Sequence, residues 1–357
     1  MGVRRLHVEG YRSLRDVTVE FGAITVVVGP NGSGKTNLYR ALRLAHACGE
    51  GRIARTVVQE GGMPSIVYAG RRRGEAKVEL AVDLDDMSYE VCLATEGILA
   101  PFPRDPVIKR ERILLPGTGK QRVEMLDRVG ATAFVRDGEG YRITFPAAFH
   151  SSESVLAQLM DARQFPELVY VRETLRQMRF HHHFRSDDDA PARQPGLSTR
   201  TLAVSDDGSD LAAALVTIAR EGEGETLQRC VADAFDGAEV DITEDDSGRL
   251  DFALRIGAMT RPLSARELSD GQLHFLFLAA VLLSQRPPVM VVLNEPEASL
   301  HDQLLPALSE LVAAAASRMQ VVLTTHSSSL ADSLLKHEGA VGVELQVQAG
   351  TTSVSRL

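Results

Sequence analysis

The chain has 357 residues, of which 44% are hydrophobic and 24% charged, and this composition predicts a folded protein with roughly two to three domain-sized units. Its formal net charge of −9 argues against a charge-driven coat for nucleic acid, although a local basic groove stays open. Three cysteines far apart in sequence exclude a disulfide framework and a zinc ribbon. Because the N-terminus lacks a secretory signal and the longest apolar run spans only residues 275–283, we expect a cytoplasmic protein without a membrane partner.

The first part of the chain predicts strands, a glycine-rich turn and a helix. Residues 4–9 and 15–20 alternate between polar and apolar side chains as strands do, and residues 23–28 form an apolar run typical of a buried strand. A helix is predicted from about 36 to 47, where apolar residues recur every three or four positions. Between residues 64 and 146, short apolar runs separated by Gly, Asp and Pro predict an antiparallel β meander.

The middle and the end of the chain differ in pattern. Between residues 151 and 283 the apolar spacing is helical, with a polar, proline-containing loop at 186–198. The last part returns to buried strands of the parallel type at 289–293 and 320–324, with a helix at about 302–318 between them. The chain is therefore predicted to be an α/β protein. Helices in its middle part are predicted at residues 155–160, 167–178, 211–219 and 226–235.

A phosphate-binding loop is the most specific motif in the chain. Residues 29–36 read GPNGSGKT and match the pattern G-x-x-x-x-G-K-[ST] between a predicted strand and a predicted helix. Backbone N–H groups of such a loop close around phosphate oxygens at a helix N-terminus, whose dipole favours anions. Lys35 is expected to reach the β- and γ-phosphates, and the Thr36 hydroxyl is expected to bind Mg²⁺. The predicted phosphate-binding residues are Asn31, Gly32, Ser33, Gly34, Lys35 and Thr36.

A second polar site follows a buried strand. Residues 289–301 read VMVVLNEPEASLH, so polar side chains come at the carboxyl end of the strand, where ligands bind in α/β sheets. Glu295 is placed to polarise an attacking water as a general base, and the alternative is an ordinary carboxylate at a strand end. Ser269 lies 26 residues upstream, in ELSDGQ, and His326 lies 31 residues downstream, after a strand that ends in TTH. A lone histidine is more often a surface or capping residue, but its place after a strand favours a functional one.

These motifs, taken in order, resemble the head of an ABC-type ATPase of the RecF and SMC-like class, and more narrowly the compact standalone ATPases within it. GPNGSGKT is similar to the Walker A motif, LSDGQ (268–272) to the LSGGQ signature, and NEPE (294–297) to Walker B. ASLH (298–301) is similar to the D-loop, and THS (325–327) to the H-loop. The opening RRLHVEGYRSLRDVTVEF is similar to the entry strands of the class. The resemblance covers most of the chain.

The resemblance implies a P-loop NTPase fold, namely an ABC-ATPase head with a RecA-like core, an antiparallel β subdomain and a helical lobe. Residues 1–150 and 285–357 would form the nucleotide-binding lobe. Residues 151–284 would form the helical lobe, which carries the signature motif.

The resemblance also implies a mechanism that depends on ATP and Mg²⁺. Two heads would face each other head to tail around two ATP molecules, so that Ser269 and Gly271 of one chain contact the γ-phosphate held by Lys35 of the other. His326 would sense that phosphate. Hydrolysis through Glu295 would then release the homodimer.

Two further assignments come from the same resemblance. Gln158 resembles a Q-loop glutamine, which would contact the nucleotide and Mg²⁺, and the alternative is a solvent-facing helix residue. Arg12, in GYRSL, is a candidate for a place near the nucleotide, and the alternative is a surface arginine on a strand.

The chain departs from the family pattern at two positions. Asn294 stands where Walker B has an aspartate; its amide oxygen can accept a hydrogen bond from a Mg²⁺-bound water but carries no negative charge. Asp270 replaces a glycine of the signature, and we expect its carboxylate to point away from the phosphate. We therefore expect looser Mg²⁺ binding, with turnover that is slow or that depends on dimerisation or on a partner.

The resemblance suggests a role in DNA repair or in defence against foreign DNA, with DNA and a separate effector, such as a nuclease, as candidate partners. A nuclease domain and a long coiled coil are not expected within this chain. The main alternative is a non-hydrolysing nucleotide sensor, which Asn294 favours. The energy subunit of a membrane transporter is disfavoured because Lys35 and Ser269 are 234 residues apart, more than such subunits usually have.

Two conspicuous runs have ordinary explanations. His181, His182 and His183 are adjacent, so on a helix or a strand they cannot all face one metal ion. The three arginines at residues 71–73 could contact a nucleic-acid backbone, and the alternative is a solvated hairpin turn.

Overall fold

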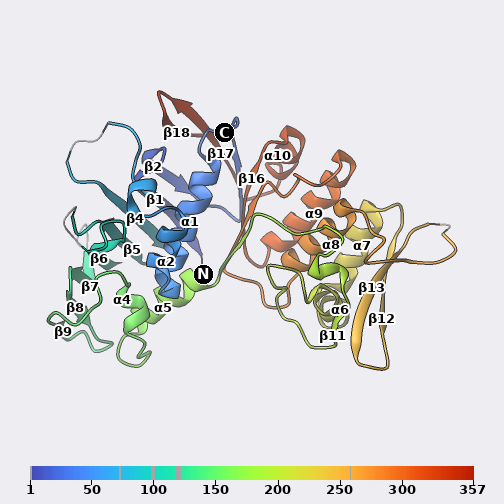
Figure 1. The fold of residues 1–357 in the computed structure, drawn as a ribbon, viewed down its shortest axis with the longest axis horizontal. Coiled ribbons are helices and arrows are strands. Elements are labelled where there is room, and N and C mark those ends of the chain that lie inside the picture. Colours follow the sequence, from blue (N-terminus) through green and yellow to red (C-terminus); the bar gives the residue numbers. More distant parts are fainter. Residues whose placement is uncertain (1, 72–73, 98–100, 118–121, 258) are drawn as a thin grey trace. The chain divides into compact units, whose positions relative to one another are not determined.

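The computed structural model describes residues 2–71, 74–97, 101–117, 122–257 and 259–357, so two of the three arginines at 71–73 lie outside the described residues. The chain divides into two compact units (Figure 1). The first comprises Met1–Gly22, Val27–Met178 and Val343–Leu357, and the second comprises Ala23–Val26 and Arg179–Gly342. Within the described part of the chain, no helix has both the length and the apolar character that crossing a membrane requires.

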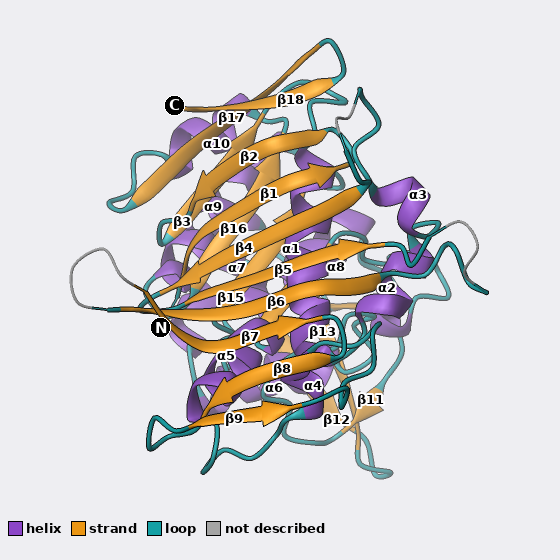
Figure 2. Ribbon diagram, turned by 90° about the vertical axis from the view of Figure 1, so that its left-hand side faces the viewer, coloured by secondary structure: helices purple, strands orange, loops and turns teal. Residues whose placement is uncertain are grey.

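The first unit contains an eight-stranded sheet with the order β2-β1-β4-β5-β6-β7-β8-β9 (Figure 2). All its neighbouring strands are antiparallel. Every second side chain of β4 is buried, because one face of the sheet packs on the core. The predicted β meander is confirmed, and the sheet also takes in the two N-terminal strands. The strands are β1 (Val3–Tyr11), β2 (Leu14–Glu20), β4 (Lys77–Leu84), β5 (Ser88–Ala94), β6 (Val107–Pro116), β7 (Arg122–Val129), β8 (Thr132–Arg136) and β9 (Arg142–Phe145).

Among the described residues of the first unit there are five helices, and two of them pack closely together. A side chain at Gly49 in α1 would come within 2.9 Å of Leu175 Cβ in α5, so a glycine allows the two helices to approach. The predicted lobe boundaries at residues 150 and 284 stay predictions. The two compact units are divided at residues 178 and 342. The five helices are α1 (Lys35–Glu50), α2 (Ile53–Gln59), α3 (Met63–Ile66), α4 (Val155–Gln158) and α5 (Pro166–Arg176).

The second unit is mainly helical. Helix α8 has apolar side chains around most of its circumference, and these side chains are buried, as expected for a helix that is enclosed by other elements. The helices of this unit are α6 (Leu211–Glu221), α7 (Gly224–Ala234), α8 (Asp270–Leu282), α9 (Leu305–Ala316) and α10 (Ser328–Leu334), and two 3-10 turns are η1 (Pro191–Arg193) and η2 (Asp302–Leu304).

A small antiparallel sheet interrupts the helical pattern that the sequence predicts for residues 151–283. Strands β12 (Glu239–Glu244) and β13 (Arg249–Arg255) form a hairpin, and β11 (Gly196–Leu197) and β14 (Leu263–Ser264) pair with β13. The prediction was wrong here because EVDITE and RLDFALR alternate with a period of two on either side of a polar turn, which is the pattern of a hairpin.

Six further strands have the order β10-β15-β16-β3-β17-β18. β15 and β16 are parallel, whereas β17 and β18 form an antiparallel hairpin. All five residues of β15 are buried, in agreement with the sequence pattern. The strands are β3 (Ile24–Val28), β10 (Met178–His181), β15 (Met290–Asn294), β16 (Gln320–Thr325), β17 (Ala340–Gln348) and β18 (Thr351–Arg356).

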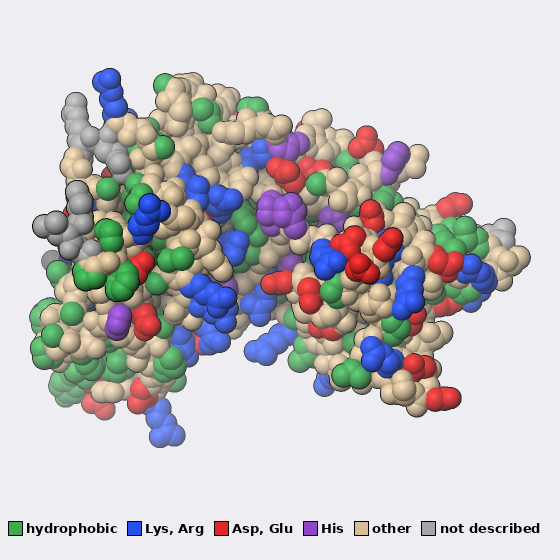
Figure 3. Space-filling model, in the orientation of Figure 1, with side chains coloured by type: hydrophobic (Ala, Val, Ile, Leu, Met, Phe, Trp, Pro, Cys, Tyr) green, Lys and Arg blue, Asp and Glu red, His purple; other side chains and the backbone are tan. Residues whose placement is uncertain are grey.

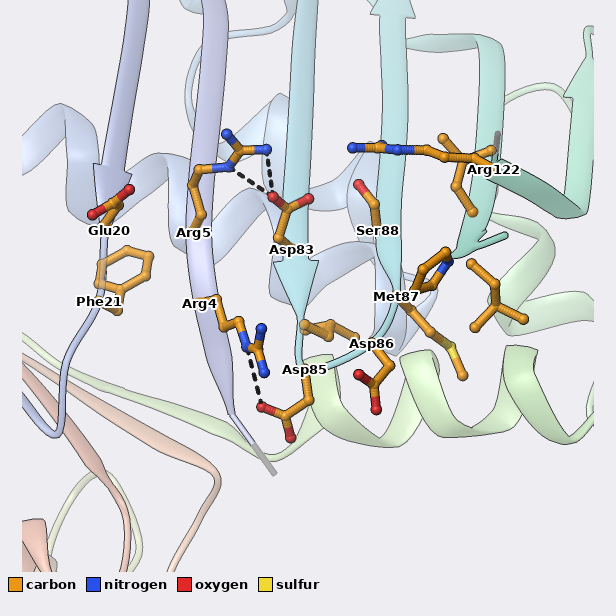
Figure 4. A pocket seen from close by; sticks show the side chains of 14 residues that line it. Arg4, Arg5, Glu20, Phe21, Asp83, Asp85, Asp86, Met87, Ser88 and Arg122 are labelled. Carbon is orange, nitrogen blue, oxygen red and sulfur yellow. Dashed lines mark hydrogen bonds and ion pairs between the residues drawn. The ribbon is translucent and has the colours of Figure 1, made fainter. Parts of the chain in front are cut away.

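An open groove at one end of the eight-stranded sheet is lined by side chains of both charges (Figure 4). Arg5 Nε donates to Asp83 Oδ2 at 2.7 Å, and Arg4 Nε lies 3.8 Å from Asp85 Oδ1. Exposed pairs of this kind contribute about 0–1 kcal/mol each. Since its basic side chains already face acidic ones, we assign no ligand to this groove.

Candidate nucleotide site

The phosphate-loop motif lies between β3 and α1, as predicted. The chain leaves the β-branched strand β3, passes Gly34 in a left-handed conformation (φ 107°), and enters α1 at Lys35. The first turn of α1 has no acidic residue and no side-chain cap. Its backbone N–H groups and the positive end of its dipole therefore meet no carboxylate of the helix itself, as an anion site requires.

Lys35 closes the loop. Its side chain is 4% exposed, and Nζ donates to the carbonyl oxygens of Gly29 at 2.6 Å and Pro30 at 3.2 Å. Asn31 and Gly32 are exposed at the outside of the loop. An incoming phosphate would compete with the two carbonyls for the protons of the ammonium group.

The acidic site lies in the second unit, at the carboxyl ends of two adjacent parallel strands. Asn294 at the end of β15 is in register with Thr324 of β16, and Thr324 Oγ1 donates to Asn294 Oδ1 at 3.0 Å. Glu295 follows with a left-handed backbone (φ 52°), and its N–H donates to Thr324 O at 3.0 Å. A non-glycine residue in this conformation is uncommon, and such positions concentrate at functional sites.

The structure brings Glu295 and His326 together. His326 Nε2 lies 3.0 Å from Glu295 Oε1, and both side chains are about one-third exposed, at 37% and 34%. The backbone N–H of His326 donates to Glu297 Oε1 at 2.8 Å, and the Thr325 hydroxyl donates to the same oxygen. Glu297 thus fixes the loop that carries the histidine. The arrangement can hold a water beside a carboxylate whose other neighbour is an imidazole.

The signature motif begins helix α8 with a capping box. Ser269 Oγ accepts from Gln272 N at 3.3 Å, and Gln272 Oε1 accepts from Ser269 N at 2.9 Å. A side chain at Gly271 would lie 3.1 Å from Ser299 O, so the glycine lets the signature approach the D-loop segment. Ser269 is exposed.

Two family profiles match separate segments of the chain. An AAA domain family matches residues 5–86, and the family described as "AAA domain, putative AbiEii toxin, Type IV TA system" matches residues 233–332. The chromosome partition protein Smc of Bacillus subtilis is 40% identical over 92 residues, which cover 24% of this chain and 7% of that protein. The OLD nuclease of Thermus scotoductus is 45% identical over 42 residues, or 12% of this chain and 8% of that protein. The matches therefore span less than a tenth of these relatives' length.

Solved structures match along the whole chain. The crystal structure of an SMC head bound to the C-winged helix domain of ScpA aligns over 100% of this chain and 98% of its own, with a TM-score of 0.59 and 15% identity. The chain has the SMC-like ABC ATPase head fold. An SMC head with an extended coiled coil, bound to the C-terminal domain of ScpA from Pyrococcus furiosus, aligns over 100% and 96% with a TM-score of 0.56 and 14% identity. The fold and the family resemblance predicted from the sequence are confirmed.

The structure places a histidine, His182, beside Asn294, a contact that the sequence did not predict. His182 follows β10, the sheet neighbour of β15, and its Nδ1 lies 2.7 Å from Asn294 Nδ2. Because an amide nitrogen only donates, His182 accepts this hydrogen bond through Nδ1. Asn294, 4% exposed, is thus held by Thr324 on its oxygen and by His182 on its nitrogen. Among the described residues, no group of three or more His, Cys, Asp or Glu side chains could hold a metal ion.

A buried arginine, Arg193, supports the signature segment at residues 268–272. Arg193 in η1 is 4% exposed and donates to the carbonyl oxygens of Leu268 at 2.7 Å, Ala265 at 3.0 Å and Ser186 at 2.8 Å. The same guanidinium lies 3.0 Å from Asp270 Oδ1. The carboxylate that replaces the family glycine therefore pairs with Arg193. The sequence assigned residues 186–198 only to a polar loop and gave no signal for this contact.

Gln158 and Arg12 both contact neighbours within the first unit. Gln158 Oε1 accepts from His150 N at 3.1 Å, and its Nε2 donates to Glu153 O at 3.1 Å, so the side chain folds back on the preceding turn. Arg12 Nη2 donates to Glu60 Oε2 at 2.8 Å. Their roles toward nucleotide and Mg²⁺ stay predictions.

Proposed function

We propose that this head binds and hydrolyses ATP and acts as an ATP-dependent dimerising switch. The observation that supports it most is the Glu295–His326 pair at the ends of two parallel strands, in a chain that also carries a Walker A loop. A carboxylate at this place, with an imidazole 3.0 Å away, has the chemistry to orient a water and accept its proton.

Each part of the two half-sites has a role in this proposal. Lys35 exchanges the carbonyls of Gly29 and Pro30 for β- and γ-phosphate oxygens, and the backbone N–H groups of the loop bind the same anion. Glu295 accepts the proton of the attacking water. His326 holds that carboxylate in place and senses the γ-phosphate.

The donors that the resemblance assigns to Mg²⁺ carry less charge than the family usually provides. Thr36 offers a hydroxyl, and Asn294 Oδ1 accepts one hydrogen bond from Thr324 and keeps a second lone pair. Gln158 is a third oxygen donor by resemblance. When bound, the ion would neutralise charge on the β- and γ-phosphates. Because Asn294 is neutral, the proposed site is looser than one with aspartate.

A second head would complete the site through the signature. The N-terminus of α8 is exposed at Ser269, and its dipole favours the γ-phosphate of a partner chain. The pairing of Asp270 with Arg193 offsets the negative charge that this carboxylate brings to the motif. Two heads related head to tail would therefore sandwich two ATP molecules.

DNA and a protein effector, such as a nuclease, are proposed as partners of the switch. On the face drawn in Figure 3, acidic side chains gather over the second unit and basic ones stand in several groups, mostly over the first. With a net charge of −9, DNA contact has to be local. The SMC heads of similar fold are bound to domains of ScpA, which supports a protein partner for this fold.

The test uses Glu295→Gln, which keeps the shape of the side chain and removes the base. We expect this variant to bind ATP, to lose turnover, and to sediment as a dimer with ATP, with or without duplex DNA. Glu310→Gln, at an exposed position of α9, is the matched control and should behave as the wild type. A Glu295→Gln chain that stays monomeric under every condition contradicts the switch.

A non-hydrolysing nucleotide sensor is the second candidate, and the neutral Asn294 favours it. Such a sensor would bind ATP and change its association without forming ADP. Single-turnover experiments with excess wild-type protein over labelled ATP separate the two functions, because the ATPase releases phosphate and the sensor does not.

A further inference from the structure

The Walker A loop is hydrogen-bonded to strand β18, near the C-terminal end of the sequence. Thr352, in β18, donates its hydroxyl to the carbonyl oxygen of Ser33 at 2.9 Å, and Thr352 Oγ1 also lies 2.7 Å from Ser13 Oγ. Asn37 Nδ2 donates to the same serine hydroxyl at 2.9 Å. Thr352 is 2% and Ser33 1% exposed, so the hydrogen bond between them is buried within the first unit.

The direction of these hydrogen bonds follows from their protons. A hydroxyl has one proton, and Thr352 uses its proton on the Ser33 carbonyl. Ser13 must therefore donate to Thr352, and it accepts from Asn37. The series runs from Asn37 through Ser13 and Thr352 to Ser33, so it begins in the first turn of α1 and ends in the loop before that helix. We call these four residues the Walker A bracket.

The bracket fixes the orientation of the peptide between Ser33 and Gly34, which belongs to the phosphate-binding loop. In a trans peptide the carbonyl of Ser33 and the N–H of Gly34 point in opposite directions. A hydrogen bond to the Ser33 carbonyl therefore also sets the direction of the Gly34 N–H. Gly34 has a left-handed backbone (φ 107°), and a Cβ there would lie 2.4 Å from Thr352 Oγ1. The glycine is therefore required both by the turn and by the close approach of Thr352.

The strand that carries Thr352 is anchored at several points. The backbone N–H of Thr352 donates to Ser13 O at 2.9 Å, and Thr351 Oγ1 bonds to the hydroxyl of Tyr68. β18 pairs with β17 over its whole length and packs against β2. A change in the conformation of the Walker A loop is thus opposed by the β17–β18 hairpin.

We propose that Thr352 is a positioning residue for nucleotide binding, and that the β17–β18 hairpin is thereby coupled to occupancy of the Walker A loop. This inference rests on the proposed ATP binding. Coupling between two sites is reciprocal. Loss of the Thr352 hydroxyl should weaken nucleotide binding, and bound nucleotide should slow the opening of β18.

The test compares three variants by ATP affinity, measured calorimetrically, and by hydrogen exchange. Thr352→Val keeps the size of the side chain but leaves the Ser33 carbonyl without its donor, and we expect about tenfold weaker ATP binding. The peptide spanning residues 30–38 should exchange faster. Thr352→Ser keeps the hydroxyl and should restore both readouts. Thr144→Val, at an exposed position of β9, is the matched control.

Each outcome decides one of the two proposals. If the wild type binds ATP no better than Lys35→Ala, the proposed function fails, whatever Thr352 does. If the wild type binds ATP and Thr352→Val binds as tightly as Thr144→Val, the bracket does not position the loop. Equal losses in Thr352→Val and Thr352→Ser would assign the effect to packing and overturn the inference. In the unmodified protein, ATP should slow exchange in residues 351–356, and unchanged exchange there contradicts the coupling.

Discussion

His326 Nε2 and Glu295 Oε1 lie 3.0 Å apart, at the ends of strands that are adjacent and parallel. Glu295 has a left-handed backbone, which for a non-glycine residue costs about 1–3 kcal/mol. Two hydrogen bonds from its N–H to Thr324 hold it there. The strand ends thus impose the position of the carboxylate, and the imidazole sets its orientation.

His326→Ala should slow ATP turnover by about 10²-fold or more, because Glu295 loses the partner that orients it. ATP affinity should fall much less than turnover, since the phosphate loop is not altered. Steady-state turnover and calorimetric affinity check this split. His337→Ala, which removes a half-buried histidine eleven positions further along, should leave turnover unchanged. Full turnover in His326→Ala would show that the carboxylate acts without the histidine.

Asn294→Asp should tighten Mg²⁺ binding and raise turnover. The new carboxylate adds the negative charge that the site lacks and still accepts from the Thr324 hydroxyl. We expect the Mg²⁺ concentration for half-maximal activity to fall. Asn294→Ala removes the oxygen and should shift the same concentration upwards. If neither Mg²⁺ dependence nor turnover changes in Asn294→Asp, the neutral amide does not limit this site.

Arg193→Met should destabilise the protein by about 3 kcal/mol or more, because three carbonyl oxygens lose a buried charged donor. Asp270→Gly, in contrast, should change stability by less than about 1 kcal/mol, since the Asp270 side chain is 65% exposed. Urea denaturation of both variants measures the difference. Equal effects would mean that the ion pair, and not the carbonyl contacts, carries the role of Arg193.

The sequence predicted the parts of the site whose geometry is local. The Walker A loop needs a strand, a glycine-rich turn and a helix in immediate succession, and all three are readable from neighbouring residues. Glu295 and His326 were predictable because both follow buried strands, and the carboxyl ends of adjacent parallel strands lie at one edge of a sheet.

The supporting residues were not predictable, because their partners are distant in sequence. Thr352 and Ser33 are 319 positions apart, His182 and Asn294 are 112 apart, and Arg193 and Leu268 are 75 apart. Only the tertiary fold brings such pairs together, and no spacing in the sequence indicates it. A single threonine or histidine on a strand is compatible with many environments, so its residue type alone carries little information.

Acidification should destabilise the second unit through His274. Burial in α8 lowers the pKa of this histidine to about 4, and its ring stacks on Phe184 with the ring centroids 5.8 Å apart. In the unfolded chain the pKa is about 6.5. Between these two values the unfolded chain binds a proton that the folded chain excludes, so stability falls as the pH falls from about 6.5 toward about 4.

His274→Phe keeps an aromatic ring against Phe184 and removes the titrating group. From pH 7.5 to 5.0 the wild type should lose about 2 kcal/mol more stability than this variant. Urea unfolding at both pH values measures the difference, and the carboxylates titrate alike in the two proteins and cancel. Burial also lowers the pKa of His181 to about 4, so part of the acid sensitivity should remain in the variant. An identical loss in both proteins would show that His274 is protonated without unfolding.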